Sequence, residues 1–215
     1  MDYSENTVSY TTTNSYATLN TLTDKTKNVW VVLHGIGYLS RYFLRYFDEL
    51  PPEENYIIAP QAPSKYYLKN NYRHVGASWL TKEATQQETQ NVMAYLDAVY
   101  AAEKFPIDLN FIVFGYSQGV SVATRWVAQK RIQCDHLVLY AGGIPEELRA
   151  SDFEFLAKNQ SKITTLVGDA DEYLTEERQA LETKKIERLF GGKAKQILFK
   201  GGHEIKKELI LNLVK

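Results

Sequence analysis

Short runs of consecutive apolar residues alternate along the chain with longer segments in which apolar residues recur every three or four positions. The short runs are typical of strands buried on both faces, and the longer segments are typical of amphipathic helices. The predicted strands cover residues 29–33, 56–59, 109–114, 137–140, 163–167 and 196–199. The predicted helices cover residues 39–50, 82–104 and 175–190, a segment around 122–127 and one after His203. This alternation predicts an α/β fold with a mostly parallel central sheet and helices on both faces.

Two further segments near the start of the chain have their own signals. Residues 8–10 and 16–19 flank a stretch rich in Thr, Asn and Ser, which predicts an opening β-hairpin. Residues 64–73 are rich in aromatic residues and are predicted to be irregular. The chain of 215 residues shows no internal repeat and no low-complexity linker, so we expect a single domain over residues 1–215.

Composition and charge narrow the function classes. A formal net charge of −1 gives no electrostatic case for a nucleic-acid or membrane-surface partner. No stretch approaches 18 apolar residues, and residues 1–20 lack the basic and apolar regions of a signal peptide. The single cysteine, Cys134, excludes an intramolecular disulfide and a cysteine-based metal site. We therefore expect a cytoplasmic protein without stable membrane insertion, whose oligomeric state the sequence leaves open.

The pentapeptide Gly115-Tyr116-Ser117-Gln118-Gly119 lies between a predicted strand and a predicted helix. In that setting a serine occupies a sharp turn that exposes its hydroxyl above the sheet, and the next backbone N–H points toward a developing oxyanion. Glycines two positions to either side let the strand and the helix approach. The pattern also occurs as an ordinary glycine turn. The strand before it and the helix after it favour Ser117 as the nucleophile of an α/β-hydrolase fold.

The chain order of the triad in this fold is serine, acid, histidine, which limits the choice of base. Of the four histidines, only His136 and His203 follow Ser117. Asp135 is the only carboxylate between Ser117 and His136, and an immediate neighbour cannot orient the imidazole. His203 is therefore the predicted general base.

The acid that orients His203 is expected in the loop after residues 163–167. This loop contains two aspartates, Asp169 and Asp171. One carboxylate would accept a hydrogen bond from the imidazole, and the other would cap the turn or the following helix. Spacing alone leaves both aspartates open as the acid.

Four further motifs stand in order with the pentapeptide around Ser117: Leu33-His34-Gly35-Ile36-Gly37, Pro60-Gln61-Ala62-Pro63, Ser78-Trp79 and Gly202-His203-Glu204. In these motifs the chain resembles the phospholipase/carboxylesterase family of small α/β-hydrolases, which includes acyl-protein thioesterases. The resemblance implies the α/β-hydrolase fold and a Ser-Asp-His triad. The family's Gly-x-x-Asp acid motif selects Asp171 over Asp169, although Val167 stands where a histidine is common.

The same resemblance implies that the backbone N–H groups of Ile36 and Gln118 form the oxyanion hole. Tyr38 stands where many members have an acidic or small residue, which points to a different entrance from that of the thioesterases. We expect Trp79 and Tyr38 to contribute to substrate binding. The implied mechanism needs no metal ion and no organic cofactor.

Two basic segments allow a second interpretation. Lys65, Lys69 and Arg73 are interleaved with tyrosines, as in surfaces that stack nucleic-acid bases, but the near-zero net charge favours an aromatic loop at the cleft mouth. Arg41 and Arg45 lie one helical turn apart and can either meet an anionic substrate or form a solvated helix face. We favour the solvated face.

The sequence thus predicts a serine carboxylesterase that cleaves small-molecule esters of short or medium acyl chains through an acyl-enzyme. A lysophospholipase or acyl thioesterase with the same triad is the second hypothesis, and it requires a hydrophobic acyl channel. A non-catalytic binding protein on a hydrolase scaffold is the third hypothesis. It is disfavoured because no member of the triad is missing.

Overall fold

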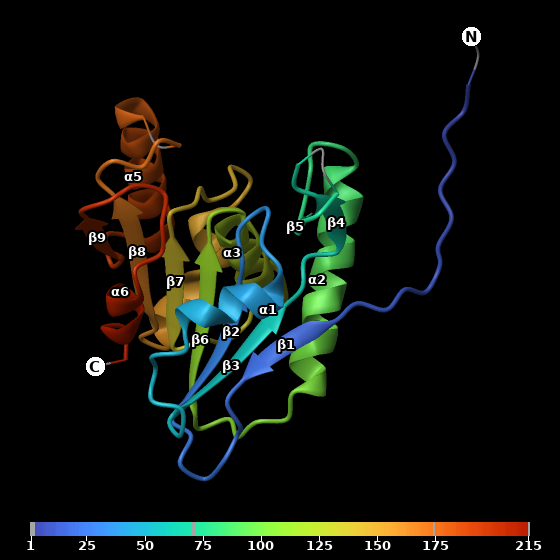
Figure 1. Cartoon of the computed structure of the whole chain (residues 1–215). Helices are drawn as coiled ribbons and strands as arrows, with labels where there is room; N and C mark the ends of the chain where they lie inside the picture. Colours follow the sequence, from blue (N-terminus) through green and yellow to red (C-terminus); the bar gives the residue numbers. More distant parts are fainter. Residues whose placement is uncertain (1–2, 70–71, 174, 215) are drawn as a thin grey trace.

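A seven-stranded sheet forms the centre of the computed structural model, which describes residues 3–69, 72–173 and 175–214. From one edge to the other, the strands are β1 (Tyr16–Leu19), β3 (Asn55–Pro60), β2 (Asn28–Leu33), β6 (Asn110–Tyr116), β7 (His136–Tyr140), β8 (Lys162–Gly168) and β9 (Lys195–Phe199). β1 pairs antiparallel with β3, and the other neighbours pair parallel (Figure 1). The prediction of a mostly parallel sheet is confirmed.

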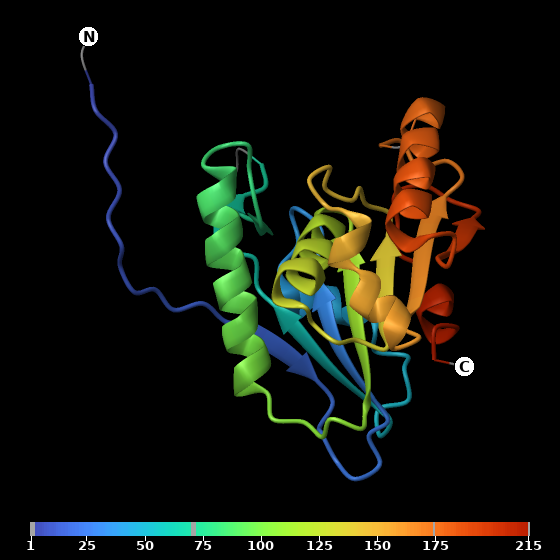
Figure 2. The ribbon, with the colours of Figure 1, turned by 180° about the vertical axis from the view of Figure 1, so that it is seen from behind.

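Helices cover both faces of this sheet (Figures 1 and 2). One face carries α2 (Thr85–Ala102), α3 (Gln118–Lys130), α4 (Glu154–Lys158) and α5 (Glu176–Phe190), with the short 3₁₀ helix η2 (Ala150–Asp152) just before α4. The other face carries α1 (Ser40–Phe43), the 3₁₀ helix η1 (Leu44–Tyr46) and α6 (Lys207–Leu211). This arrangement confirms the predicted fold class, the α/β-hydrolase fold. None of the described helices combines the length and the apolar character that crossing a lipid bilayer requires.

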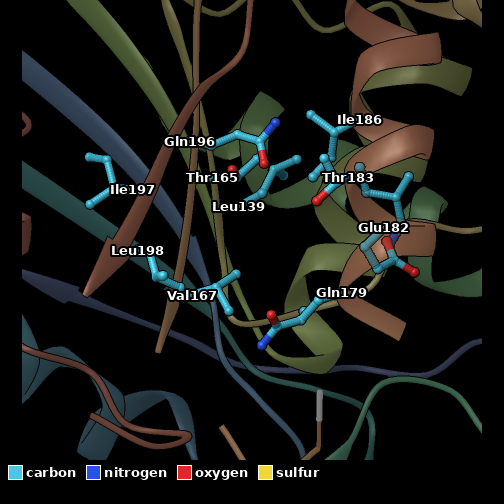
Figure 3. Close-up of a pocket in the computed structure, with 12 residues that line it drawn as sticks. Leu139, Thr165, Val167, Gln179, Glu182, Thr183, Ile186, Gln196, Ile197 and Leu198 are labelled. Carbon is cyan, nitrogen blue, oxygen red and sulfur yellow. The ribbon is translucent and has the colours of Figure 1, made fainter. Parts of the chain in front are cut away.

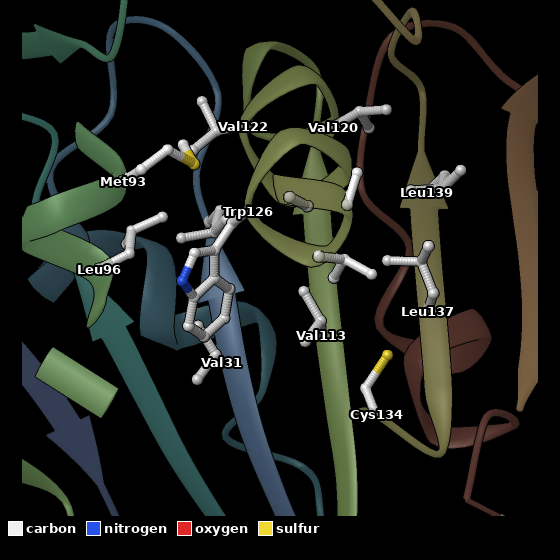
Figure 4. Packing of buried hydrophobic residues seen from close by; sticks show 14 of the residues in the cluster. Val31, Met93, Leu96, Val113, Val120, Val122, Trp126, Cys134, Leu137 and Leu139 are labelled. Atoms are coloured by element: carbon white, nitrogen blue, oxygen red, sulfur yellow. The ribbon is translucent and has the colours of Figure 1, made fainter. Parts of the chain in front are cut away.

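The two hydrophobic cores follow from the alternation of side chains along the buried strands. In β2, Val31 points into the core under α2 and α3, whereas Trp30 points into the core under α1 and α6. Figure 4 shows Trp126 of α3, Leu96 of α2 and Val31 of β2, which belong to the same cluster of buried residues. Because each inner strand buries residues on both faces, its sequence is a mostly apolar run rather than an alternating one.

The predicted opening hairpin is wrong. Residues 16–19 form β1 as expected, but β1 pairs with β3 at the edge of the sheet. Residues 8–10 form no strand, and the side chain of Val8 is 84% exposed. The partner of β1 is long and fully buried, so it offers more apolar contact than a three-residue segment between polar neighbours can provide.

The prediction that residues 64–73 are irregular is also wrong for the first four residues of this segment. β4 (Ser64–Tyr67) forms an antiparallel ladder with β5 (Val75–Ser78), and residues 70–71 lie outside the described part of the chain. The ladder lies on the loop that follows β2: the Gly37 N–H donates to the Ala77 carbonyl, and the Ala77 N–H donates to the Tyr38 carbonyl. The spacing of apolar residues did not predict this hairpin, because the small residues of β5 are not typical of a strand.

The predicted helix over residues 39–50 is divided into α1 and η1. Its four apolar residues are nevertheless all buried in the structure: Leu39, Phe43, Phe47 and Leu50. Tight turns replace the second half of the helix, with the Phe47 N–H donating to the Leu44 carbonyl and the Leu50 N–H donating to the Phe47 carbonyl. The apolar spacing therefore predicted the buried face correctly and the helix length incorrectly.

Two leucines in the same sheet test the assignment of the core. Leu137 of β7 is 0% exposed, whereas Leu198 of β9 is 67% exposed. We expect Leu137→Ala to lower the free energy of unfolding by about 2–5 kcal/mol because it leaves a cavity. We expect Leu198→Ala, the matched control, to change it by less than about 0.5 kcal/mol. Urea denaturation followed by tryptophan fluorescence measures both, and equal losses would contradict the assignment.

Candidate active site

A cleft of about 430 Å³ opens at the carboxyl edge of the sheet. Parallel strands end on the same side, so the loops that follow them meet there. Ser117 follows β6, Asp171 lies in the loop after β8, and His203 lies in the loop after β9. The loop after β2 brings Ile36 to the same cleft. Residues that are more than 160 positions apart along the chain are thus neighbours in space.

A continuous row of hydrogen bonds joins the three predicted triad residues. The Oγ atom of Ser117 lies 2.9 Å from Nε2 of His203, and Nδ1 of His203 lies 2.8 Å from Oδ2 of Asp171. The side chain of Asp171 is 0% exposed, and its Oδ1 atom accepts a 3.0 Å hydrogen bond from the Tyr173 N–H. An ionised carboxylate accepts from Nδ1–H, which leaves the lone pair of Nε2 facing the serine hydroxyl. The arrangement is therefore suited to removing the proton of Ser117.

The second aspartate of the same loop does not reach His203. Asp169 is exposed, and its Oδ1 atom accepts a 2.9 Å hydrogen bond from the Gly201 N–H. It therefore ties the loop after β8 to the loop after β9. The structure brings Asp171 to the histidine, and its catalytic role stays a prediction.

Ser117 occupies a turn that strains the backbone. Its φ of 53° and ψ of −118° lie in a region that residues with side chains rarely adopt. Its N–H donates a 2.9 Å hydrogen bond to the Tyr140 carbonyl of β7, which holds the turn in place. A Cβ atom at Gly119 would overlap the Leu33 carbonyl oxygen, and one at Gly115 would lie 2.6 Å from the Gly119 carbonyl oxygen. The glycine spacing of the pentapeptide thus follows from this close approach.

The two amides predicted to form the oxyanion hole belong to residues that line the cleft beside Ser117, Ile36 and Gln118. Gln118 is the first residue of α3, a position whose N–H has no partner within the helix. The amides that follow Ile36 are tied to backbone carbonyls: Gly37 donates to Ala77, and Tyr38 donates to Gly35. These bonds fix the loop around Ile36.

The side chain of Gln118 bonds the backbone of residues 79–80, next to the site. Its Nε2 atom donates to the Leu80 carbonyl at 2.7 Å, and its Oε1 atom accepts from the Trp79 N–H at 2.8 Å. The indole Nε1 of Trp79 donates to the His34 carbonyl at 2.8 Å. Trp79 is 0% exposed and does not line the cleft, so the expectation that it binds substrate is corrected. Its bulk and its N–H instead anchor the loop that carries Ile36.

His34, in the first motif of the resemblance, is a neutral structural residue. Its Nδ1 lies 2.8 Å from the Gly35 carbonyl, and its Nε2 accepts a 3.2 Å hydrogen bond from the Ala62 N–H. An accepting Nε2 places the proton on Nδ1. Burial lowers the pKa of His34 to about 4, so the imidazole is uncharged near neutral pH.

Tyr38 lines the cleft, and its role in substrate binding stays a prediction. Its hydroxyl shares a 3.0 Å hydrogen bond with that of Tyr46. The rings of Tyr116 and Tyr173 lie 5.3 Å and 4.7 Å from the imidazole ring of His203. Sequence reasoning missed several residues of the cleft wall: Tyr116, Ser121, Ala141, Gly142, Gly143, Tyr173 and Arg178. Position was the available signal for four of them, because Ala141, Gly142 and Gly143 directly follow β7 and Tyr173 lies in the loop after β8. Their types alone form no motif.

Arg41 and Arg45 do not line the cleft. Both are exposed, and their guanidinium groups lie over the rings of Tyr42 and Tyr46, at 4.7 Å and 5.1 Å from the ring centroids. The structure therefore supports a solvated helix face rather than contact with a substrate.

A second cavity, of about 110 Å³, lies between α5 and strands β7–β9. Figure 3 shows Glu182 and Ile186 of α5 facing Leu139 of β7 across it. It shares Gly142 with the cleft but contains none of the predicted triad residues. Among residues 3–69, 72–173 and 175–214, no group of three or more His, Cys, Asp or Glu side chains is placed to hold a metal ion.

Comparisons with known proteins agree with this architecture. The model of a family described as Phospholipase/Carboxylesterase matches residues 14–214. Acyl-protein thioesterase 2 from Zea mays is similar at 16% identity, with a TM-score of 0.68 over 94% of this chain and 96% of that chain. A phospholipase/carboxylesterase from Dyadobacter fermentans is similar at 21% identity, with a TM-score of 0.67 over 96% and 99%. At such identities the structures show a shared fold. No curated protein sequence matches the chain.

The neutral state of buried His34 predicts a loss of stability in acid. The pKa of a histidine in the unfolded chain is near 6.5, and folding lowers that of His34 to about 4. Folding therefore favours the neutral form, and this contribution is complete above pH 6.5 and is lost as the pH falls toward 4. Between about pH 7.5 and about pH 5, we expect the wild type to lose about 2 kcal/mol more unfolding free energy than His34→Asn.

Urea denaturation at the two pH values measures this difference. Asparagine retains a donor near the position of Nδ1, so the variant is expected to keep the bond to the Gly35 carbonyl. His74→Asn, which removes an exposed histidine, is the matched control. If His34→Asn and the wild type lost equal stability, His34 would not be the titrating group.

Proposed function

We propose that this chain, which belongs to the phospholipase/carboxylesterase family, is a serine hydrolase that cleaves carboxylic esters of short or medium acyl chains. The observation that carries the proposal is the row of hydrogen bonds from Ser117 Oγ through His203 to Asp171, in which Ser117 and His203 line an open cleft. A serine hydroxyl is a weak nucleophile, and a base that is itself oriented by a carboxylate activates it.

In the proposed mechanism, Nε2 of His203 takes the proton of Ser117 as Oγ attacks the ester carbonyl. The backbone N–H groups of Ile36 and Gln118 hold the negative oxygen of the tetrahedral intermediate. Asp171 stabilises the imidazolium, which then gives its proton to the leaving alcohol and leaves an acyl-enzyme. Water activated by His203 hydrolyses the acyl-enzyme and restores Ser117. Each step uses side chains and amides of this chain.

The composition of the cleft wall supports short or medium acyl chains. Of the described residues that line the cleft, only Ile36 and Ala141 carry aliphatic side chains. The rest are glycine, aromatic, hydroxyl, amide or charged residues, so a long acyl chain would find little aliphatic surface. For this reason a lysophospholipase or acyl thioesterase, which has to bury a long chain, ranks second.

Two serines in the cleft provide a matched test of the nucleophile. Ser121 lines the same cleft as Ser117, but its Oγ atom donates a 2.9 Å hydrogen bond to the Gln118 carbonyl. We expect Ser117→Ala to abolish labelling by a fluorophosphonate probe and to lower kcat for 4-nitrophenyl butyrate by at least about 10³-fold. Ser121→Ala should retain labelling. Absence of labelling and of ester hydrolysis in folded wild type would favour a non-catalytic binding protein.

The two aspartates of the loop after β8 test the acid. We expect Asp171→Asn to lower kcat by about 10³–10⁴-fold, because an amide cannot hold the imidazole in the required tautomer or stabilise its charge. Asp169→Asn should change kcat by less than about threefold, since the amide oxygen still accepts from the Gly201 N–H. Steady-state hydrolysis of 4-nitrophenyl butyrate measures both variants. A larger loss in Asp169→Asn would reverse the assignment.

A further inference from the structure

Arg178 of α5 has no part in the mechanism above, although it lines the same cleft as Ser117 and His203. Among the described residues of the cleft wall it is the only lysine or arginine, and none of them is an aspartate or a glutamate. The wall therefore carries one permanent positive charge that no catalytic step uses. A cleft lined by charge of one sign raises the local concentration of ligands with the opposite sign.

The guanidinium of Arg178 is tied to a residue that contacts His203. Its Nη1 atom donates a 3.1 Å hydrogen bond to the carbonyl of Tyr173, whose ring contacts the imidazole of His203. Its Nη2 atom lies 3.7 Å from the point that a Cβ atom at Gly143 would occupy. The same point lies 3.3 Å from Oε1 of Glu182, so Nη2 and this oxygen flank the space that the missing side chain of Gly143 leaves. One nitrogen of the guanidinium is thus anchored to a carbonyl, and the other faces this space beside the cleft.

The neighbouring carboxylates do not neutralise Arg178. It forms no ion pair within 4.0 Å with any carboxylate in the described part of the chain. Glu182 lies one helical turn further on the same face, but it accepts from the Ile144 N–H at 3.1 Å and from Lys185 Nζ at 2.9 Å. Glu177 and Glu176 are one and two positions before Arg178. Side chains at these spacings do not face each other on a helix.

We propose that Arg178 selects esters that carry a carboxylate group a few bonds from the scissile carbonyl. This inference rests on the proposed esterase function and names its substrate class. The planar guanidinium offers parallel N–H donors that match the two oxygens of a carboxylate, and the pairing is stronger than a neutral hydrogen bond. The carboxylate belongs either to the acyl part or to the alcohol part of the ester, and two substrate pairs distinguish these sources.

The test compares charged and neutral esters of matched size. The acyl pair is mono-4-nitrophenyl adipate and 4-nitrophenyl hexanoate, and the alcohol pair is 4-acetoxybenzoate and its methyl ester. In at least one pair, we expect Arg178→Gln to lower the ratio of kcat/KM for the anionic ester to that for the neutral ester by about tenfold, mainly through KM. Arg178→Lys should restore part of the ratio. Added salt should lower the wild-type ratio, because it screens the charge.

Arg188→Gln is the matched control, because Arg188 is an exposed arginine of the same helix outside the cleft wall. It should leave both ratios as in the wild type. An Arg178→Gln variant that hydrolyses the charged and neutral esters with equal losses, or with no change in either ratio, would overturn the proposal while leaving the esterase function intact. A wild type that neither hydrolyses the neutral esters nor reacts with a fluorophosphonate would overturn the esterase function itself.

Discussion

The first turn of α3 lies so close to the end of β2 that residue 119 has no room for a side chain. A Cβ atom at Gly119 would overlap the Leu33 carbonyl oxygen, and Ser117 adopts a positive φ that costs about 1–3 kcal/mol for a residue with a side chain. The neighbouring strands hold this conformation, since the Ser117 N–H is bonded to the Tyr140 carbonyl of β7. The strained turn therefore exists because the sheet and the helix around it are already well packed.

A series of hydrogen bonds links the start of α3 to the loop after β2. Gln118 follows the turn, and its side-chain amide bonds the backbone of Trp79 and Leu80. Trp79 in turn bonds the His34 carbonyl, and neutral His34 bonds the carbonyl of Gly35. Among the described residues, no buried side-chain nitrogen or oxygen atom lacks a hydrogen-bond partner. Because an unpaired buried polar group costs about 1–3 kcal/mol, this set of bonds stabilises the observed conformation of the loop that carries Ile36.

Sequence reasoning predicted the parts of the molecule that depend on local pattern and chain order. Mostly apolar runs located β2, β3, β6, β7, β8 and β9. The first five of these strands are largely buried on both faces and need apolar side chains at most positions, whereas the edge strand β9 is largely exposed. Chain order singled out His203, which the structure brings within 2.9 Å of Ser117. The β4–β5 hairpin and the position of Trp79 were not predictable in this way. They depend on contacts between distant segments, and a buried tryptophan in a motif looks the same whether it lines a pocket or supports the wall behind it.

The residues proposed to carry out the chemistry and the residue proposed to select the substrate are under different constraints. Ser117 cannot move without disturbing the packing of α3 on β2, and the side chain of Asp171 is enclosed completely. Arg178 is exposed on the surface of α5, and its replacement would leave no buried group unpaired. Exchanges at such a position cost little folding free energy, because exposed side chains make few contacts. A fold of this kind can therefore keep one row of hydrogen bonds while the charge of its cleft wall varies, which is why motifs predict the reaction and not its substrate.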